Sequence, residues 1–184
     1  MRILLTKSVK RFYVIYFNGF SLRGEETLFE EYIDKGDISV AGFSFGAQKA
    51  FDYVYHSKER VDRLILLSPA FFQTEKPSFN RTQLHYFEAG EKSYVKQFLK
   101  NVTHPSNFNL SAHLKVGTKE ELKSLLTYKW DKDKIQTVLN KGTSIEVFLG
   151  GKDKIINSHE TVKFFSSSTV YLLKNSGHLL KESL

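Results

Sequence analysis

The stretch Gly42–Gly46, which reads GFSFG, decides the fold of this sequence because it lies between a predicted strand and a predicted helix. Residues 37–41 are predicted to form a short strand, and residues 47–55 a helix. Glycines on both sides let strand and helix approach closely, so that Ser44 can occupy a tight, strained turn. We expect Ser44 to project from the end of a strand, although a glycine-rich turn without a chemical role is the alternative.

Further strands on both sides of this turn predict a sheet. Residues 11–18, 61–70, 144–149 and 169–173 are short runs of β-branched, aromatic or leucine side chains, as in strands that are buried on both faces. Residues 25–35 have the pattern of an amphipathic helix that ends at a glycine. Strands that alternate with helices imply an α/β domain over residues 1–184, with a mostly parallel sheet and helices on both faces.

Residues 71–140 have a different character. They alternate polar loops with amphipathic stretches and contain no convincing strand. We expect this segment to be a helical insertion, a lid, over one edge of the sheet. It carries eleven Lys or Arg against seven Asp or Glu residues, so a lid would be basic.

Composition narrows the function classes. The chain has no cysteine, which excludes disulfides, thiolate zinc sites and a cysteine nucleophile. No histidine pair or acidic cluster has the spacing of a metal site, so we expect neither metal nor cofactor. No apolar run is long enough to cross a membrane and no leader is recognisable, so a soluble, cytoplasmic protein is expected. We also expect it to be a monomer.

The formal charge of +7 favours an acidic partner. The lysines are scattered, and no helix-turn-helix, RNP or zinc-finger signature occurs. We therefore expect neither nucleic acid nor a membrane as the partner.

A serine nucleophile needs a base, usually histidine, and that histidine needs a carboxylate. In parallel sheets such groups lie at the carboxyl ends of strands. Of six histidines, His178 alone lies in a short loop just past a predicted strand, and Asp153 follows the strand at 144–149. A surface histidine and a solvated loop aspartate are the alternatives. The aspartates at 37, 131 and 133 fit this pattern less well.

Acyl transfer also needs N–H donors that stabilise a developing oxyanion. The amide of Phe45, directly after the serine, is one candidate. The loop after residues 11–18 is the only source for a second, and we assign the amide of Phe20. A plain β-turn at Asn18-Gly19 is the alternative.

These segments resemble the α/β-hydrolase superfamily along nearly the whole chain. The forms GFSFGAQKA, IEVFLGGKDKI and NSGHLLKES, in so short a chain, are similar to the small atypical pimeloyl-acyl carrier protein methyl ester esterases of biotin synthesis, the BioV type. The resemblance implies hydrolysis of the methyl ester of pimeloyl-acyl carrier protein with release of methanol. Ser44 would be the nucleophile, Asp153 the acid and His178 the base.

Two departures from the larger relatives concern the scaffold. Those relatives usually have histidine-glycine before the oxyanion loop, where this chain has Asn18-Gly19. They also have a longer segment between that loop and the serine, so at least one strand and one helix of the usual sheet are expected to be absent. The size of the sheet and the shape of the oxyanion loop are the properties that these departures affect.

Acyl carrier proteins are acidic, so the resemblance gives the basic lid a meaning as a docking surface. Candidate docking charges are Arg81, Lys92, Lys96, Lys100 and Lys123. Two other functions remain open. The same fold and triad could serve a general short-chain carboxylesterase or thioesterase, and a binding protein could use the scaffold without catalysis.

Overall fold

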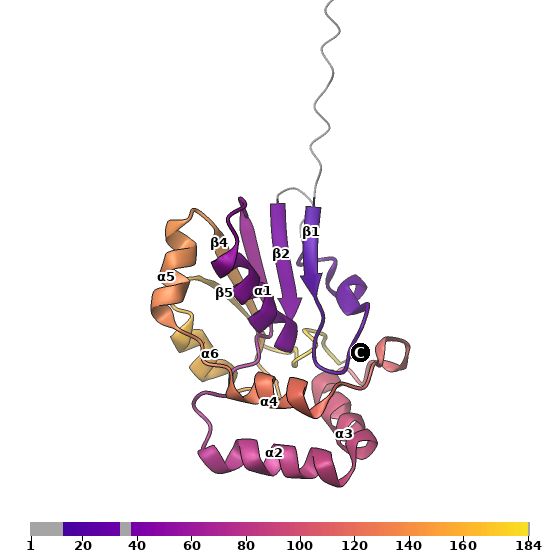
Figure 1. Cartoon of the computed structure of the whole chain (residues 1–184). Helices are drawn as coiled ribbons and strands as arrows, with labels where there is room; N and C mark the ends of the chain where they lie inside the picture. Colours follow the sequence, from indigo (N-terminus) through magenta and orange to yellow (C-terminus); the bar gives the residue numbers. More distant parts are fainter. Residues whose placement is uncertain (1–12, 34–37, 184) are drawn as a thin grey trace, which may run out of the picture.

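The computed structural model describes residues 13–33 and 38–183, and all statements about the fold concern these ranges. Its centre is one sheet of five parallel strands, arranged in chain order (Figure 1). The strands are β1 (Tyr13–Phe17), β2 (Ile38–Phe43), β3 (Arg63–Leu67), β4 (Ser144–Gly150) and β5 (Thr169–Leu173). Every predicted strand is therefore present. The predicted residues 11, 12 and 37 lie outside the described ranges.

The strand register brings the carboxyl ends to one edge of the sheet. Phe17 pairs with Gly42, and Phe43 with Leu67. At the other side Gly150 pairs with Leu173. The loops that follow the five strands therefore all begin at the same edge of the sheet. In open parallel sheets, binding and catalytic sites form at this edge.

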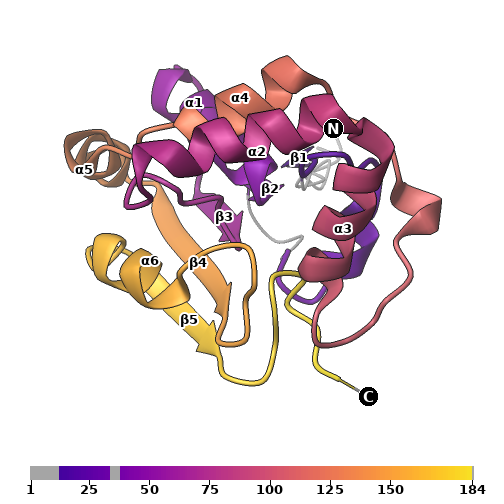
Figure 2. The ribbon, with the colours of Figure 1, turned by 90° about the horizontal axis from the view of Figure 1, so that it is seen from below.

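Six α-helices and two 3-10 helices lie in the described residues. They are α1 (Phe45–His56), α2 (Pro77–Ala89), α3 (Glu91–Thr103), α4 (Lys119–Thr127), α5 (Lys132–Asn140), α6 (Ser158–Phe164), η1 (Glu25–Phe29) and η2 (Ser111–His113). Within the described ranges no helix is both long and apolar enough to cross a bilayer. In Figure 2, seen from below, α2 crosses in front of β1 and β2, and α6 lies beside β4.

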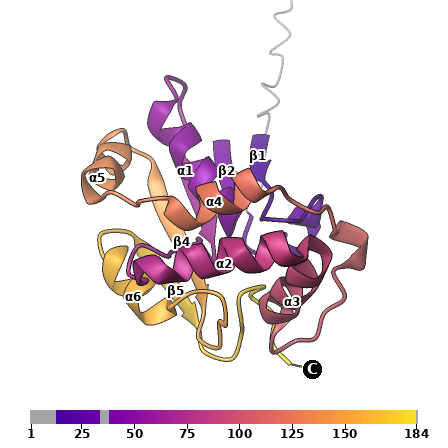
Figure 3. The ribbon, with the colours of Figure 1, turned by 60° about the horizontal axis from the view of Figure 1, so that its bottom comes forward.

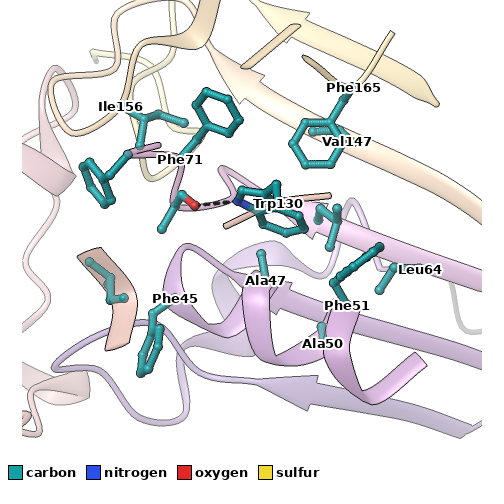
Figure 4. Close-up of a cluster of buried hydrophobic side chains, with 14 of the residues drawn as sticks. Phe45, Ala47, Ala50, Phe51, Leu64, Phe71, Trp130, Val147, Ile156 and Phe165 are labelled. Carbon is teal, nitrogen blue, oxygen red and sulfur yellow. Dashed lines mark hydrogen bonds between the residues drawn. The ribbon is translucent and has the colours of Figure 1, made fainter. Parts of the chain in front are cut away.

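One face of the sheet is covered by α1, α5 and α6. Alternate strand residues such as Leu64 and Val147 point to this face, where they meet Phe51 of α1 and the ring of Trp130. Figure 4 shows this cluster, in which the Trp130 Nε1–H donates a 2.9 Å hydrogen bond to the carbonyl of Ala70. The bond satisfies the indole N–H, so that the ring can be buried without an unpaired donor.

The other face is covered by η1, the end of α3 and the C-terminal segment. Phe29 and Ile33 pack there against Phe43 and Ile65. We predicted an amphipathic helix over residues 25–35, and this is wrong for the described part, which is the 3-10 helix η1 followed by turns. The N–H groups of Tyr32 and Ile33 both donate to the carbonyl of Phe29, which closes the segment in tight turns. Residues 34–37 lie outside the described ranges.

The insertion at residues 71–140 holds four α-helices and no strand, apart from an isolated bridge between Leu114 and Leu22. Three of them, α2, α3 and α4, lie together beyond the carboxyl ends of the strands (Figures 1 and 3). The fourth, α5, contacts α1 beside the sheet. The predicted insertion thus contains three helices above the strand ends and one that belongs to the layer on the sheet.

Candidate active site

Ser44 forms the turn between β2 and α1. Its φ of 54° and ψ of −110° are rare for a residue with a side chain. The Ser44 N–H donates a 2.8 Å bond to the carbonyl of Leu67, which ties the turn to β3. A Cβ at Gly42 would collide with the carbonyl of Gly46, and a Cβ at Gly46 with the carbonyl of Phe17. Both flanking glycines are therefore required by close backbone packing, as the sequence predicts.

The structure brings Ser44, His178 and Asp153 into one chain of hydrogen bonds. The distance from His178 Nε2 to Ser44 Oγ is 2.9 Å, and from His178 Nδ1 to Asp153 Oδ2 it is 2.6 Å. A carboxylate can only accept a hydrogen bond, so Nδ1 carries the ring proton and its N–H donates a hydrogen bond to Asp153. Nε2 is then free to accept from the Ser44 hydroxyl. This is the arrangement that activates a serine for attack on an acyl carbon.

Asp153 is oriented by its own loop. Its Oδ1 accepts from the N–H of Ile155 at 2.6 Å and from that of Ile156 at 3.1 Å. Its side chain is fully buried. One carboxylate oxygen is therefore held by the backbone while the other faces His178.

The backbone of His178 is anchored from two elements. The Ser68 hydroxyl, just past β3, donates 2.7 Å to the carbonyl of His178, and the N–H of Leu179 donates to the carbonyl of Val102 in α3. Ser68 falls inside the predicted strand at 61–70 and was not predicted as a site residue. Its position at a strand's carboxyl end, among the other site residues, was the signal that could have identified it.

The two amides expected as oxyanion donors come from the start of α1 and from the loop after β1. Phe45 is the first residue of α1, where helical N–H groups have no partner within the helix. Phe20 follows β1 in a turn in which the Leu22 N–H donates to the Gly19 carbonyl at 3.2 Å. Neither the Phe45 nor the Phe20 amide donates to any acceptor in the described part of the chain. Both amides are thus available to a ligand oxygen. The alternative to an oxyanion loop was a plain β-turn at Asn18-Gly19; the turn that forms begins at Gly19 and includes Phe20.

A cavity of about 580 Å³ lies between α2, α3, α4 and the loop after β4. Its walls are mostly apolar, with Phe72, Phe98 and Ile155 among them, and the hydroxyl of Tyr94 donates to Gln83. Burial raises the pKa of Tyr94 to about 12, so this donor stays protonated at neutral pH. An apolar chain with a few polar groups would fit such a space.

Gln48 links the elbow helix to this cavity. It is buried in α1, and its Nε2 donates to the carbonyls of Ala70 and Leu125, at 2.9 and 3.1 Å. Leu125 lines the cavity from α4. Sequence reasoning did not identify Gln48, because nothing local marks a helical glutamine as a cross-link between distant segments.

The site is closed in this structure. Ser44 is 2% exposed and His178 0%, and neither lines the cavity. A substrate can reach Ser44 only if covering side chains or helices move, as active-site covers often do.

The five expected docking charges are all exposed, but the structure does not bring all of them together. Lys92, Lys96 and Lys100 lie one turn apart on α3 and line a groove of about 820 Å³, which we call the α3 groove. Its other wall is the segment 107–116, with the exposed side chains of Phe108 and Leu114. Arg81 on α2 and Lys123 on α4 line neither this groove nor the cavity.

In the described ranges no three His, Cys, Asp or Glu side chains lie close enough together to hold a metal ion.

No family model and no curated protein matches this chain. Solved structures do match. An α/β hydrolase called MGS-M2, from a deep-sea metagenome, has a TM-score of 0.62 at 11% identity and covers 94% of this chain and 84% of its own. Carboxylesterase CesB from Bacillus subtilis has a TM-score of 0.60 at 12% identity, covering 91% and 77%. BioG from Haemophilus influenzae has a TM-score of 0.56 at 9% identity, covering 90% and 88%.

Some matching proteins are much longer: this chain spans 54% of the length of one of them and 63% of the length of another. Identities this low establish the architecture alone. The parallel sheet with its surrounding helices agrees with the α/β architecture of these neighbours. The chain therefore has an α/β-hydrolase fold, of a reduced size.

Proposed function

We propose that this protein is a serine carboxylesterase with Ser44 as nucleophile, His178 as base and Asp153 as the acid that orients the base. The observation that carries the proposal is the unbroken chain of hydrogen bonds from Ser44 Oγ through the His178 ring to Asp153. A buried serine at a strained turn, next to a correctly oriented imidazole, has no evident structural reason to be there.

The mechanism follows from these positions. Ser44 Oγ attacks the ester carbonyl and His178 Nε2 takes its proton, while the amides of Phe20 and Phe45 stabilise the oxyanion. The tetrahedral intermediate then expels the alcohol, which takes the proton from His178 and leaves an acyl group on Ser44. Water, deprotonated by His178, attacks this ester in turn. The second tetrahedral intermediate releases the acid as Ser44 Oγ leaves and takes the proton back from His178. The balance is one ester and one water consumed for one acid and one alcohol.

For the substrate we propose the methyl ester of pimeloyl-acyl carrier protein. The motif resemblance around Ser44, Asp153 and His178 supports it, as does the apolar cavity beside the site. A cavity of about 580 Å³ is within the range of small-molecule sites and suits a seven-carbon diacid chain. The product would be a free carboxylate at the far end of the chain, together with methanol.

The α3 groove supports a protein carrier of acidic character as the partner. Its lining has three lysines and no acidic side chain, and none of the three lysines forms an ion pair with a described residue. Exposed Phe108, Leu114 and Val116 add an apolar wall. Basic side chains beside an apolar groove complement an acidic amphipathic helix.

The geometry also relates this groove to the cavity. Ser93 and Gln97 of α3 line both. A carrier on the groove would therefore sit one helix away from the cavity, and its acyl arm could cross α3 at these two small or polar residues.

The test is hydrolysis of methyl pimeloyl-carrier protein and of the free methyl ester, measured by methanol release. Ser44→Ala should lower kcat at least about a thousandfold with the fold intact. Ser57→Ala, at the other end of α1, is the matched control and should keep full activity. Equal kcat/KM for both substrates would assign a general carboxylesterase or thioesterase instead, and no hydrolysis of either would assign a binding protein.

A further inference from the structure

Glu25 is a buried acid that the mechanism does not use. Its side chain is 0% exposed, although it opens the 3-10 helix η1, where an acidic residue normally faces water. Its Oε2 has no hydrogen-bond partner in the described ranges. A carboxyl group held in this way is costly to bury, so its position calls for a function.

The contacts of Glu25 lead to the loop after β1. Its Oε1 accepts a 2.6 Å bond from the N–H of Gly19 and a 3.3 Å bond from the hydroxyl of Tyr16. Asn18 closes the same loop by accepting the N–H of Gly24 at 2.9 Å. The loop from residue 18 to residue 24 is thus fastened from its interior by two side chains.

The Gly19 contact fixes the direction of the next amide. Glu25 holds the peptide that carries the Gly19 N–H, and the Leu22 N–H holds the Gly19 carbonyl. In a trans peptide the carbonyl and the following N–H point in opposite directions. The Phe20 N–H therefore points away from the interior of the turn, where no described acceptor takes it.

A third support comes from outside the loop. The Arg23 N–H donates to the His113 carbonyl, the Lys115 N–H to the Ser21 carbonyl, and the Gly117 N–H to the Ser21 hydroxyl at 3.0 Å. These bonds join residues 21–23 to the segment between α3 and α4. None of these bonds reaches Gly19 or Phe20, so Glu25 is the side chain that hydrogen-bonds to the backbone at this end of the loop.

We propose that Glu25 is a positioning residue that holds the Phe20 amide in the orientation needed to stabilise the oxyanion. This rests on the proposed function, because it assumes that the Phe20 amide is an oxyanion donor. Glu25 itself touches no substrate and moves no proton. It supplies an acceptor for Gly19, and any side chain that keeps this acceptor at the same place should serve.

The test compares Glu25→Ala and Glu25→Gln with the wild type on a small activated ester. The alanine variant should lower kcat about 10- to 100-fold with little change in KM, since a displaced donor affects the transition state more than the ground state. It should weaken a boronic acid transition-state analogue by a similar factor. The glutamine variant keeps the acceptor oxygen and should restore kcat to within about threefold.

Glu26→Ala is the matched control, because Glu26 is the adjacent acid and is exposed; its kcat should equal that of the wild type. Amide hydrogen exchange gives a readout of the brace itself, with Gly19 protected in the wild type and in Glu25→Gln and unprotected in Glu25→Ala. If Glu25→Ala does not fold, Glu25→Asp decides, since it withdraws the carboxyl by one methylene while keeping a buried acid; its kcat should fall and its KM should not change.

If the wild type is active and Glu25→Ala has the same kcat, this proposal alone is overturned. The same holds for Glu25→Asp if Glu25→Ala does not fold. A loss that glutamine does not restore, or a fall in kcat without weaker binding of the boronic acid, also overturns this proposal alone. A wild type that hydrolyses no ester overturns both this proposal and the proposed function.

Discussion

The hydroxyl of Ser68 donates a 2.7 Å hydrogen bond to the main-chain carbonyl of His178, 110 residues further along the chain. Both residues are buried and both follow strands, β3 and β5. The bond fixes the backbone from which the imidazole reaches Ser44, and so it connects the centre of the sheet to the base.

Ser68→Ala should therefore lower kcat about threefold to thirtyfold without changing KM, because the base loses its main-chain anchor. Stability should fall by about 1 kcal/mol for the lost hydrogen bond. Steady-state kinetics and urea unfolding measure the two effects. Ser144→Ala is the matched control, since its hydroxyl donates to the carbonyl of Asp62 far from the site; an equal loss of kcat in both variants would contradict the anchoring role.

Gly46→Ala should abolish the reactivity of Ser44 or prevent folding, because the new Cβ would overlap the carbonyl of Phe17. Thermal unfolding and labelling of Ser44 report the two outcomes. Gly90→Ala is the control: its backbone is extended and its Cβ would come no closer than 3.8 Å to Ser93. The close packing of the elbow is disproved if Gly46→Ala folds and reacts like Gly90→Ala.

The burial of Glu25 predicts a pH effect on stability. Burial raises the pKa of this carboxyl, with the neighbouring Tyr16 hydroxyl and Gly19 amide acting against the shift and Glu26 adding to it. A group whose pKa is higher in the folded than in the unfolded chain binds its proton longer when folded. The free energy of unfolding should then fall as pH rises from the ordinary carboxyl range, about 4, through the raised pKa.

Glu25→Gln removes this titration. As pH rises over the same range, its free energy of unfolding should therefore increase relative to that of the wild type. Urea unfolding at a series of pH values measures the difference. Glu26→Gln, at the exposed neighbour, should run parallel to the wild type. Parallel curves for Glu25→Gln and the wild type would show that burial does not perturb Glu25.

The α3 groove predicts a substrate-dependent effect of charge. Reversal of Lys92, Lys96 and Lys100 to glutamate should raise KM for a carrier-linked ester about tenfold or more, because several exposed ion pairs of up to about 1 kcal/mol each are lost together. KM for a free methyl ester should not change. Reversal of Arg81 and Lys123, which lie outside the groove, should have a smaller effect. Equal effects of the two sets would reject the groove as the docking surface.

Much of this site follows from one rule applied to the sequence. Ser44, Asp153 and His178 each come just after a strand, and parallel strands bring those positions to one edge. The strands themselves were predictable because they are short apolar runs between turn residues. The α/β-hydrolase fold was therefore accessible from local patterns.

Other features depend on contacts that no local pattern encodes. Residues 25–35 were predicted as an amphipathic helix, yet the carboxyl of Glu25 turns inward to Gly19 and residues 25–29 form a 3-10 helix. The side chain of Gln48 donates hydrogen bonds to the carbonyls of Ala70 and Leu125, which are 22 and 77 residues further along the chain. Their partners are set by the packing of the whole chain, and tertiary contacts of this kind override local propensity.

Peptide mass spectrometry after reaction with a fluorophosphonate at neutral pH tests most directly whether Ser44 is an activated nucleophile. One adduct per chain should form rapidly on Ser44 in the wild type and be absent in Ser44→Ala. His178→Ala should slow its formation at least about a hundredfold, since the hydroxyl loses its base. An adduct on another residue, no adduct at all, or an unchanged rate without His178 would contradict the assignment of Ser44 as an activated nucleophile.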